Sequence, residues 1–112
     1  MNVHELKSWK EFFTAIKSGA RRHELRRNDR DFKVGDILLL REWDDDLAIF
    51  TGDTFRVTIT SMTSRDIPCA VSAEGLHPDF CILSVEPIAK AFGSADSLSV
   101  SDRPVAEDGI VD

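Results

Sequence analysis

The feature of this sequence that most constrains its fold is that only one segment, near the start, has the periodicity of an amphipathic helix. Apolar residues recur there at the spacing of one helical face, as Trp9, Phe12, Phe13 and Ile16. Ser8 and Glu11 have the spacing of a capping box, and Gly19 can end a helix in the left-handed conformation. The sequence therefore predicts a single helix over residues 9–18, with its apolar face in the core.

The following sequence consists of short apolar or alternating segments separated by turn residues. Residues 37–40 are a run of isoleucine and leucine, typical of a buried strand, and 54–62 alternate apolar with polar side chains. Another strand is predicted over 79–85, whereas 3–7 and 21–27 have weaker patterns. About five short strands and one helix in 112 residues favour a mainly β fold, a small barrel, because closure removes exposed strand edges.

Turn residues separate these strands. Residues 28–31 and 34–36 have the side chains of turns, and Gly35 is expected to have a positive φ. Asp44-Asp45-Asp46 is predicted to form a hairpin tip, and Thr51-Gly52-Asp53 a further turn. Phe32 is the expected apolar anchor of the first loop.

Composition and length limit the class of protein. A chain of 112 residues fits one domain, which we place at residues 1–92, followed by a flexible acidic tail over 93–112. No apolar run of about 20 residues and no secretory leader pattern is present, so we expect a cytoplasmic protein without a membrane partner. Cys69 and Cys81 are expected to be reduced core residues. Neither metal-ligand spacing nor a phosphate-binding glycine loop occurs, so no metal or cofactor is predicted.

The distribution of charge is more informative than the net charge of −6. Residues 1–41 contain 10 basic and 6 acidic side chains, a balance of +4, whereas 42–112 contain 4 basic and 14 acidic ones, a balance of −10. Six basic residues fall between Arg21 and Lys33. This asymmetry indicates an RNA or nucleotide partner for the basic part. The alternative is a solvated strand edge with scattered charges.

The geometry of the basic segment depends on whether 21–27 is a strand. In a strand, Arg22, Glu24 and Arg26 share one face, and Leu25 should face the core from the other. Glu24 would then be an acceptor between two donors. Such a group can bind the edge of a base, or it can form an ion pair of little energetic value.

A longer pattern runs through residues 3–88. It reads His4-x-Leu6-Lys7, Trp9, Gly19-x-Arg21-x-x-Glu24-x-Arg26-x-Asn28-Asp29-Arg30-Asp31-Phe32-x-Val34-Gly35-Asp36, Leu39 with Arg41-Glu42, and Thr51-Gly52. This pattern resembles the DUF3850 family, in the ASCH branch of the PUA-like superfamily, which is common in bacteria and their phages. The resemblance implies a PUA-like pseudo-barrel of about five or six strands with one N-terminal helix packed at its end.

The resemblance also implies a link to RNA. PUA-like relatives bind RNA, some of them at modified bases, and ASCH relatives are proposed RNA-binding or RNA-processing modules. One ASCH group hydrolyses N4-acylated cytidine with a lysine, a threonine and a glutamate. Aligned on Gly19, the lysine position falls at Arg21 and the threonine position at Glu24. Arginine stays protonated and cannot act as that lysine does, which argues against the same reaction here.

The resulting candidates form one set, with a cleft expected between the helix and the 21–27 strand. The predicted nucleic-acid-binding residues are Lys7, Arg21, Arg22, Glu24, Arg26, Asn28 and Arg30. The basic members would contact phosphate, and Glu24 with Asn28 would recognise a base. If the protein is a ribonuclease or a modified-nucleoside hydrolase instead, Glu24 with Lys7 is the candidate pair for proton transfer. A third hypothesis is a phage or mobile-element protein that binds a host protein through its acidic half.

Overall fold

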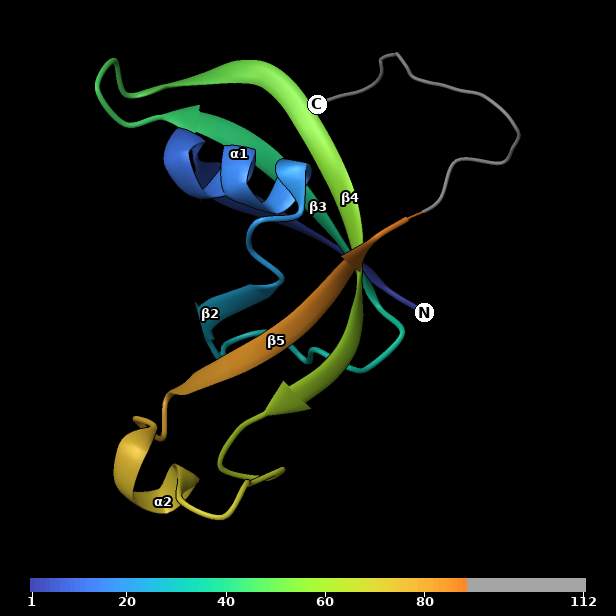
Figure 1. The fold of residues 1–112 in the computed structure, drawn as a ribbon, viewed down its shortest axis with the longest axis vertical. Helices are drawn as coiled ribbons and strands as arrows, with labels where there is room; N and C mark the ends of the chain where they lie inside the picture. The colour runs from blue at the N-terminus through green and yellow to red at the C-terminus, as the bar shows by residue number, and fades with distance from the viewer. Residues whose placement is uncertain (89–112) are drawn as a thin grey trace.

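A computed structural model describes residues 1–88 as a curled five-stranded sheet with one helix packed against it (Figure 1). The elements are β1 (Val3–Trp9), α1 (Lys10–Ser18), β2 (His23–Arg27), β3 (Ile37–Asp44), β4 (Ile49–Thr63), α2 (Ser72–Gly75) and β5 (Phe80–Pro87). The predicted fold class is confirmed: the protein is mainly β, with a half-barrel sheet and an N-terminal helix packed against it. The predicted tail over 93–112 lies outside the described residues. No helix within 1–88 has the length and apolarity to cross a membrane.

The sheet has the strand order β1-β3-β4-β5-β2. β1 is parallel to β3, and all other neighbours are antiparallel. The 15-residue β4 pairs with β3 along its first part and with β5 along its last part, so one bent strand spans the curl (Figure 1). The register shifts between Arg41 and Trp43 and between Ile59 and Ser61. Such irregularities bend a strand and increase its twist, which suits a curled sheet.

The core lies inside this curl. Its buried residues are Leu6, Phe13, Ile16, Phe32, Leu38, Leu40, Val57, Ile59, Cys81, Leu83 and Val85. Alternation sends every second side chain inward along β5 and along β4 from Phe55 to Ile59, as the sequence pattern predicts. After the register shift between Ile59 and Ser61, Met62 packs against the core and Ser61 is exposed. Phe13 and Ile16 of α1 cover the core from the helix side.

Arginine side chains, and not a backbone ladder, join β1 to β2 and to the loop that follows β2. Within residues 1–88 β1 and β2 are the edges of the sheet and do not pair with each other. Arg26 Nη2 donates to the Lys7 carbonyl at 3.1 Å, and Arg30 Nη1 donates to the Glu5 carbonyl at 2.9 Å. We call these two contacts the arginine seam. They satisfy two carbonyls on the free edge of β1.

The predicted start of the helix is wrong by one residue, and the capping box does not form. β1 continues to Trp9, which is the Cα partner of Trp43 on β3, and α1 begins at Lys10. Trp9 is the N-cap residue, and no side chain caps the helix. Pairing with β3 has overridden the local preference of Ser8. The end is as predicted, because Gly19 has a left-handed φ of 85°.

Three predictions of core packing, for Leu25, Trp9 and Phe12, are also wrong. Leu25 is 55% exposed and Trp9 is 51% exposed, whereas Glu24 is only 4% exposed. The reason is that β2 is an edge strand whose inward side faces an opening in the curl. The Glu24–Arg26 ion pair can therefore lie on the inward side of β2 and still border the solvent. Phe12, at 38% exposed, lies beside the same opening.

The turns follow the sequence with one exception. Asp44 accepts the backbone N–H groups of Asp46 and Leu47 at the predicted hairpin tip, both at 3.0 Å. Gly35 has the expected positive φ, 97°. The turn predicted at Thr51-Gly52-Asp53 is wrong, because β4 runs through it and Gly52 takes its φ of 99° within the strand.

Both cysteines are free. Cys81 is buried, as predicted, whereas the core position predicted for Cys69 is wrong, because that residue is exposed.

Candidate ligand pocket

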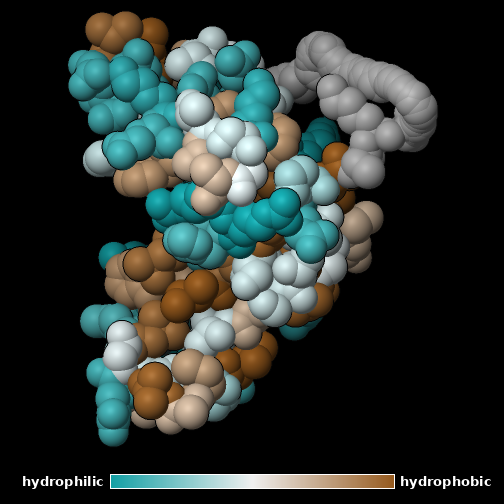
Figure 2. Space-filling view, in the orientation of Figure 1, coloured by the Kyte–Doolittle hydropathy of each residue, from teal (hydrophilic) through white to brown (hydrophobic). Residues whose placement is uncertain are grey.

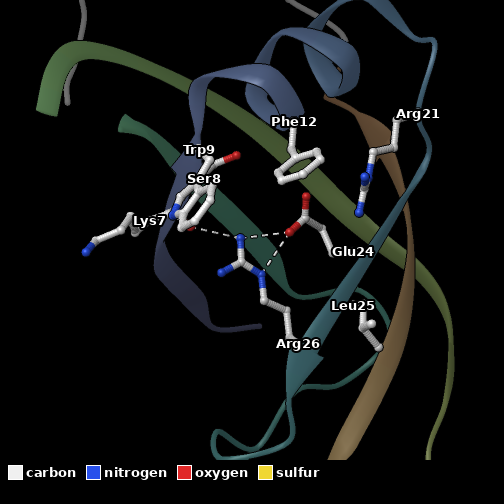
Figure 3. A pocket seen from close by; sticks show the side chains of 8 residues that line it. All are labelled: Lys7, Ser8, Trp9, Phe12, Arg21, Glu24, Leu25 and Arg26. Atoms are coloured by element: carbon white, nitrogen blue, oxygen red, sulfur yellow. Dashed lines mark hydrogen bonds and ion pairs between the residues drawn. The ribbon is translucent and has the colours of Figure 1, made fainter. Parts of the chain in front are cut away.

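A pocket of about 340 Å³ opens between α1, the end of β1 and the edge strand β2 (Figure 3). Its lining residues are Lys7, Ser8 and Trp9 of β1, Phe12 of α1, Arg21 of the following loop, and Glu24, Leu25 and Arg26 of β2. This volume is near the lower end of the range for small-molecule sites, roughly 300–1,000 Å³. The helix and two strands that are distant in sequence thus form one concave site.

A charged pair lies at the inner side of the pocket. Arg26 donates from Nε at 2.8 Å and approaches with Nη2 at 2.7 Å, both to the same carboxylate oxygen of Glu24, Oε1 (Figure 3). The Glu24 side chain is 6% exposed and that of Arg26 is 22% exposed. The second carboxylate oxygen points towards Phe12 in Figure 3. A carboxylate oxygen has two lone pairs, so Oε1 is occupied while Oε2 can accept from a ligand.

Apolar side chains form the rim. Trp9, Phe12 and Leu25 all line the pocket and are all exposed. The guanidinium carbon of Arg21 lies 4.8 Å from the ring centroid of Phe12, and its Nε donates to the His23 carbonyl at 3.2 Å. The pocket therefore combines flat apolar surfaces and a cation at its rim with a polar pair inside.

Ser8 is a lining residue that was not among the candidates predicted from the sequence. Its side chain is turned inward with that of Leu6, and its hydroxyl has no hydrogen-bond partner. The capping-box spacing had favoured a role for Ser8 at the start of the helix. Continuing the alternation of β1 from Leu6 would have placed Ser8 on the inner face, and that is the signal that could have found it.

Lys7 takes part in the pocket through its backbone carbonyl, whereas its amine lies elsewhere. Its carbonyl accepts from Arg26, whereas Nζ lies 4.0 Å from the ring centroid of Trp43 on β3. In Figure 3 the side chain points away from Glu24. The structure therefore does not bring together the amine and carboxylate that the enzymatic hypothesis would pair.

Three other predicted site residues lie outside the pocket lining. Arg22 is exposed, and its carbonyl accepts the N–H of Val85 at 3.0 Å. The backbone N–H of Asn28 donates to the Asp79 carbonyl at 2.8 Å, and Arg30 belongs to the arginine seam. Lys7, Arg21, Glu24 and Arg26 are thus the predicted residues that the fold gathers around one space.

The polar residues His4 and Asp36 form a separate buried centre. The carboxylate of Asp36 contacts His4 Nε2 at 2.9 Å and accepts the backbone N–H groups of Asn2 at 3.0 Å and Lys33 at 3.1 Å. The N–H of Asn2 first, and then His4, hold the pKa of Asp36 below its ordinary value. These contacts tie the N-terminus to the loop before β3, so Asp36 is structural, as predicted.

The acidic hairpin tip is neutralised by α1. Lys10 Nζ contacts Asp44 at 3.2 Å and Asp46 at 2.6 Å. Asp46, and next Asp44, raise the pKa of Lys10. Within residues 1–88 no cluster of three or more histidine, cysteine, aspartate or glutamate side chains has the arrangement of a metal site.

Together these features define a small mainly β domain with a mixed apolar and charged pocket at the opening of a curled sheet. The chain belongs to the DUF3850 family: residues 3–85 match its model, described as a domain of unknown function. The family predicted from the sequence is therefore confirmed.

Two further comparisons extend this result. An uncharacterised 12.9 kDa protein of Escherichia phage P2, from the region 3′ of GpA, is 36% identical over 61 residues. That match covers 54% of this chain, and the chain spans about half the length of the relative, 54%. The crystal structure of the hypothetical protein PH0355 has a TM-score of 0.51 at 16% identity, covering 79% of this chain and 100% of the other. At that identity the likeness concerns the fold alone.

Proposed function

We propose that the protein is a PUA-like, ASCH-type binding module and that its pocket holds a nucleobase, either of a free nucleotide or of an RNA strand. One observation carries the proposal: the exposed rings of Trp9 and Phe12 border a pocket whose inner side is buried Glu24 paired with half-buried Arg26. A base has apolar faces that stack on aromatic rings and edges that form hydrogen bonds. The pocket offers both kinds of contact in a volume suited to a small ligand.

The charge around the pocket supports a phosphate-bearing ligand. Arg21 is at the rim, and exposed Arg22 follows it in the same loop. Figure 2 shows a band of hydrophilic residues across the visible face at the level of the α1–β2 loop, with hydrophobic residues below it over β2 and β5. Arginines in this position can contact the phosphates of a nucleotide whose base lies in the pocket.

The same geometry favours binding over catalysis. If the resemblance to the hydrolytic ASCH group holds, its lysine position falls at Arg21, and a guanidinium stays protonated. The Lys7 amine lies against Trp43 and not beside Glu24. The pair that the enzymatic hypothesis names is thus not brought together in the pocket. Glu24 and Arg26 serve as recognition groups in this proposal.

The proposal is tested by fluorescence anisotropy with labelled 12-nucleotide RNAs of different base composition, at low salt. We expect saturable binding by the wild-type protein and weaker binding by Phe12→Ala. Phe50→Ala is a matched control, because Phe50 is 39% exposed against 38% for Phe12 but does not line the pocket. Absence of binding by the wild type to RNA and to nucleoside monophosphates would refute the proposal. An equal loss in both variants would refute the location.

A further inference from the structure

The hydroxyl of Ser8 is buried and unpaired. The residue is 3% exposed, and Oγ is the one buried side-chain nitrogen or oxygen within residues 1–88 that lacks a hydrogen-bond partner. Buried polar atoms in folded proteins are almost always paired, because a lone one loses its bonds to water and gains none. The exception at Ser8 therefore calls for a physical reason.

Folding does not supply that reason. Ser8 does not cap α1, and its place on β1, opposite Glu42 on β3, needs only backbone hydrogen bonds. An alanine would fill the same position without the unpaired oxygen. The other buried serines differ. Ser64 Oγ accepts from the N–H groups of Asp66 and Ile67, and Ser72 Oγ contacts the backbone of Cys69.

The position of Ser8 supplies a reason, because the residue lines the same pocket as Glu24. We infer that Ser8 Oγ is held unpaired for the ligand: it bonds an acceptor on the edge of a base while Glu24 Oε2 accepts a neighbouring N–H. Glu24 Oε1 is already occupied by Arg26, which leaves Oε2 for the ligand. This inference rests on the proposed function and makes its ligand more specific.

The arrangement selects a class of chemical group. An ionised carboxylate only accepts, whereas a hydroxyl both donates and accepts. Their natural complement is a planar heterocycle with an N–H beside a carbonyl or ring nitrogen. Each of the four RNA bases presents such an edge, whereas ribose and phosphate carry no N–H. The base edge, and not the sugar-phosphate, would therefore reach the inner end of the pocket.

The experiment compares Ser8→Ala with Ser64→Ala in thermal unfolding and in calorimetric titration with AMP, CMP, GMP, UMP and ribose 5-phosphate. Ser8→Ala should keep the Tm or raise it by up to about 5 °C, because it removes an unpaired oxygen. It should bind its preferred nucleotide about tenfold more weakly, as loss of one hydrogen bond predicts. Ser64→Ala should lower the Tm and leave the affinity unchanged.

Four outcomes overturn the inference, and they are distinguishable. If Ser8→Ala lowers the Tm as Ser64→Ala does, or binds nucleotides as the wild type does, the hydroxyl has no ligand role, while the proposed function stands. If the wild type binds ribose 5-phosphate as tightly as the nucleotides, the pocket does not recognise the edge of a base. If it binds neither nucleotides nor RNA, the proposed function fails, and the inference fails with it.

Discussion

At the scale of single residues, Asp36 illustrates how a buried charge can stabilise a fold. Its carboxylate contacts two backbone N–H groups and His4, and the residue is 3% exposed. Because these contacts favour the ionised form, the pKa of the folded state lies below the ordinary value of 3.8. The stabilisation is complete above that ordinary value and is lost as pH falls through the lower pKa of the folded state.

Asp36→Asn should therefore reduce the free energy of unfolding by about 2 kcal/mol at pH 7, because the amide keeps one acceptor oxygen and replaces the other with a donor. The difference from the wild type should be constant above about pH 5 and should shrink below about pH 4. Urea denaturation at a series of pH values measures both effects. A difference that stays constant down to about pH 3 would contradict the assignment.

Single residues were also where sequence reasoning had least power. It selected Glu24 and Arg26 for their charge and pattern, and the fold places both in the pocket. It put Leu25 in the core, because alternation fixes which side chains share a face but not which face is inward. It missed Ser8, because the residue type has a strong local role in capping, and only the length of β1 rules that role out.

At the scale of elements, the end of α1 depends on the left-handed backbone of Gly19. Its φ is 85°, and a Cβ at this position would have no other atom within 4 Å, so only backbone strain opposes a side chain there. Gly75 has equally open surroundings without a positive φ. These two glycines separate the conformational effect from the steric one.

Gly19→Ala should lower the free energy of unfolding by about 1 kcal/mol, because L-residues are strained in the left-handed region. Gly75→Ala should be neutral or slightly stabilising, since alanine has less freedom in the unfolded chain. Chemical denaturation of both variants gives the comparison. Equal destabilisation would show that backbone conformation is not the cause.

The edge strands β1 and β2 were predicted only weakly from the sequence, for a physical reason. β1 has one inward apolar residue, Leu6, and β2 has none, because the inward side of β2 and that of β1 beyond Leu6 border the pocket. The central strands β3, β4 and β5 have several buried apolar positions each, and their existence was predictable. Hydrophobic periodicity thus identified the strands that form the core more clearly than those that form the site.

Loss of the two seam arginines should have unequal effects. Arg26→Ala leaves the buried Glu24 carboxylate without its partner and should cost about 2 kcal/mol. Arg30→Ala removes two exposed contacts, with the Glu5 carbonyl and with Asp29, and should cost less than about 1 kcal/mol. Adding Glu24→Gln to Arg26→Ala should restore part of the loss, because it removes the unpaired charge. Denaturation curves of the single and double variants decide this, and a larger loss for Arg30→Ala would contradict it.

At the scale of the whole molecule, the two cysteines report on different parts of the fold. Cys69 is exposed, and backbone N–H groups, that of Val71 first, lower the pKa of its thiol. Burial raises the pKa of Cys81, which lies in the core. Thiolate is the reactive form, so the two sites should differ strongly in reactivity.

Ellman's reagent should therefore modify one thiol of the native protein rapidly at neutral pH, and the second only as fast as the protein unfolds. Cys69→Ser should abolish the fast phase and retain the slow one. Two thiols that react at the same rate would show that the core around Cys81 opens readily.

The basic first half and acidic second half predict how the whole protein responds to salt. If the pocket binds RNA, Arg21→Ala should reduce the slope of log Kobs against log salt concentration by about 0.7, the value for one phosphate contact on a single strand. Arg65→Ala should leave the slope unchanged, because Arg65 is exposed and does not line the pocket. Titrations between about 50 and 200 mM salt measure this. An unaltered slope in Arg21→Ala would remove Arg21 from the phosphate contacts.

The arginine seam also has a mechanical consequence. In a closed barrel, many backbone hydrogen bonds hold the first and last strands together. Here one guanidinium bonds both the Glu24 carboxylate and the Lys7 carbonyl, and a second holds Glu5. The width of the opening is therefore set by the reach of two side chains, and the same group that sets it also forms the inner side of the pocket. A ligand that displaces the Arg26 guanidinium would therefore change two things together: the pairing of Glu24 inside the pocket and the contact between β2 and β1.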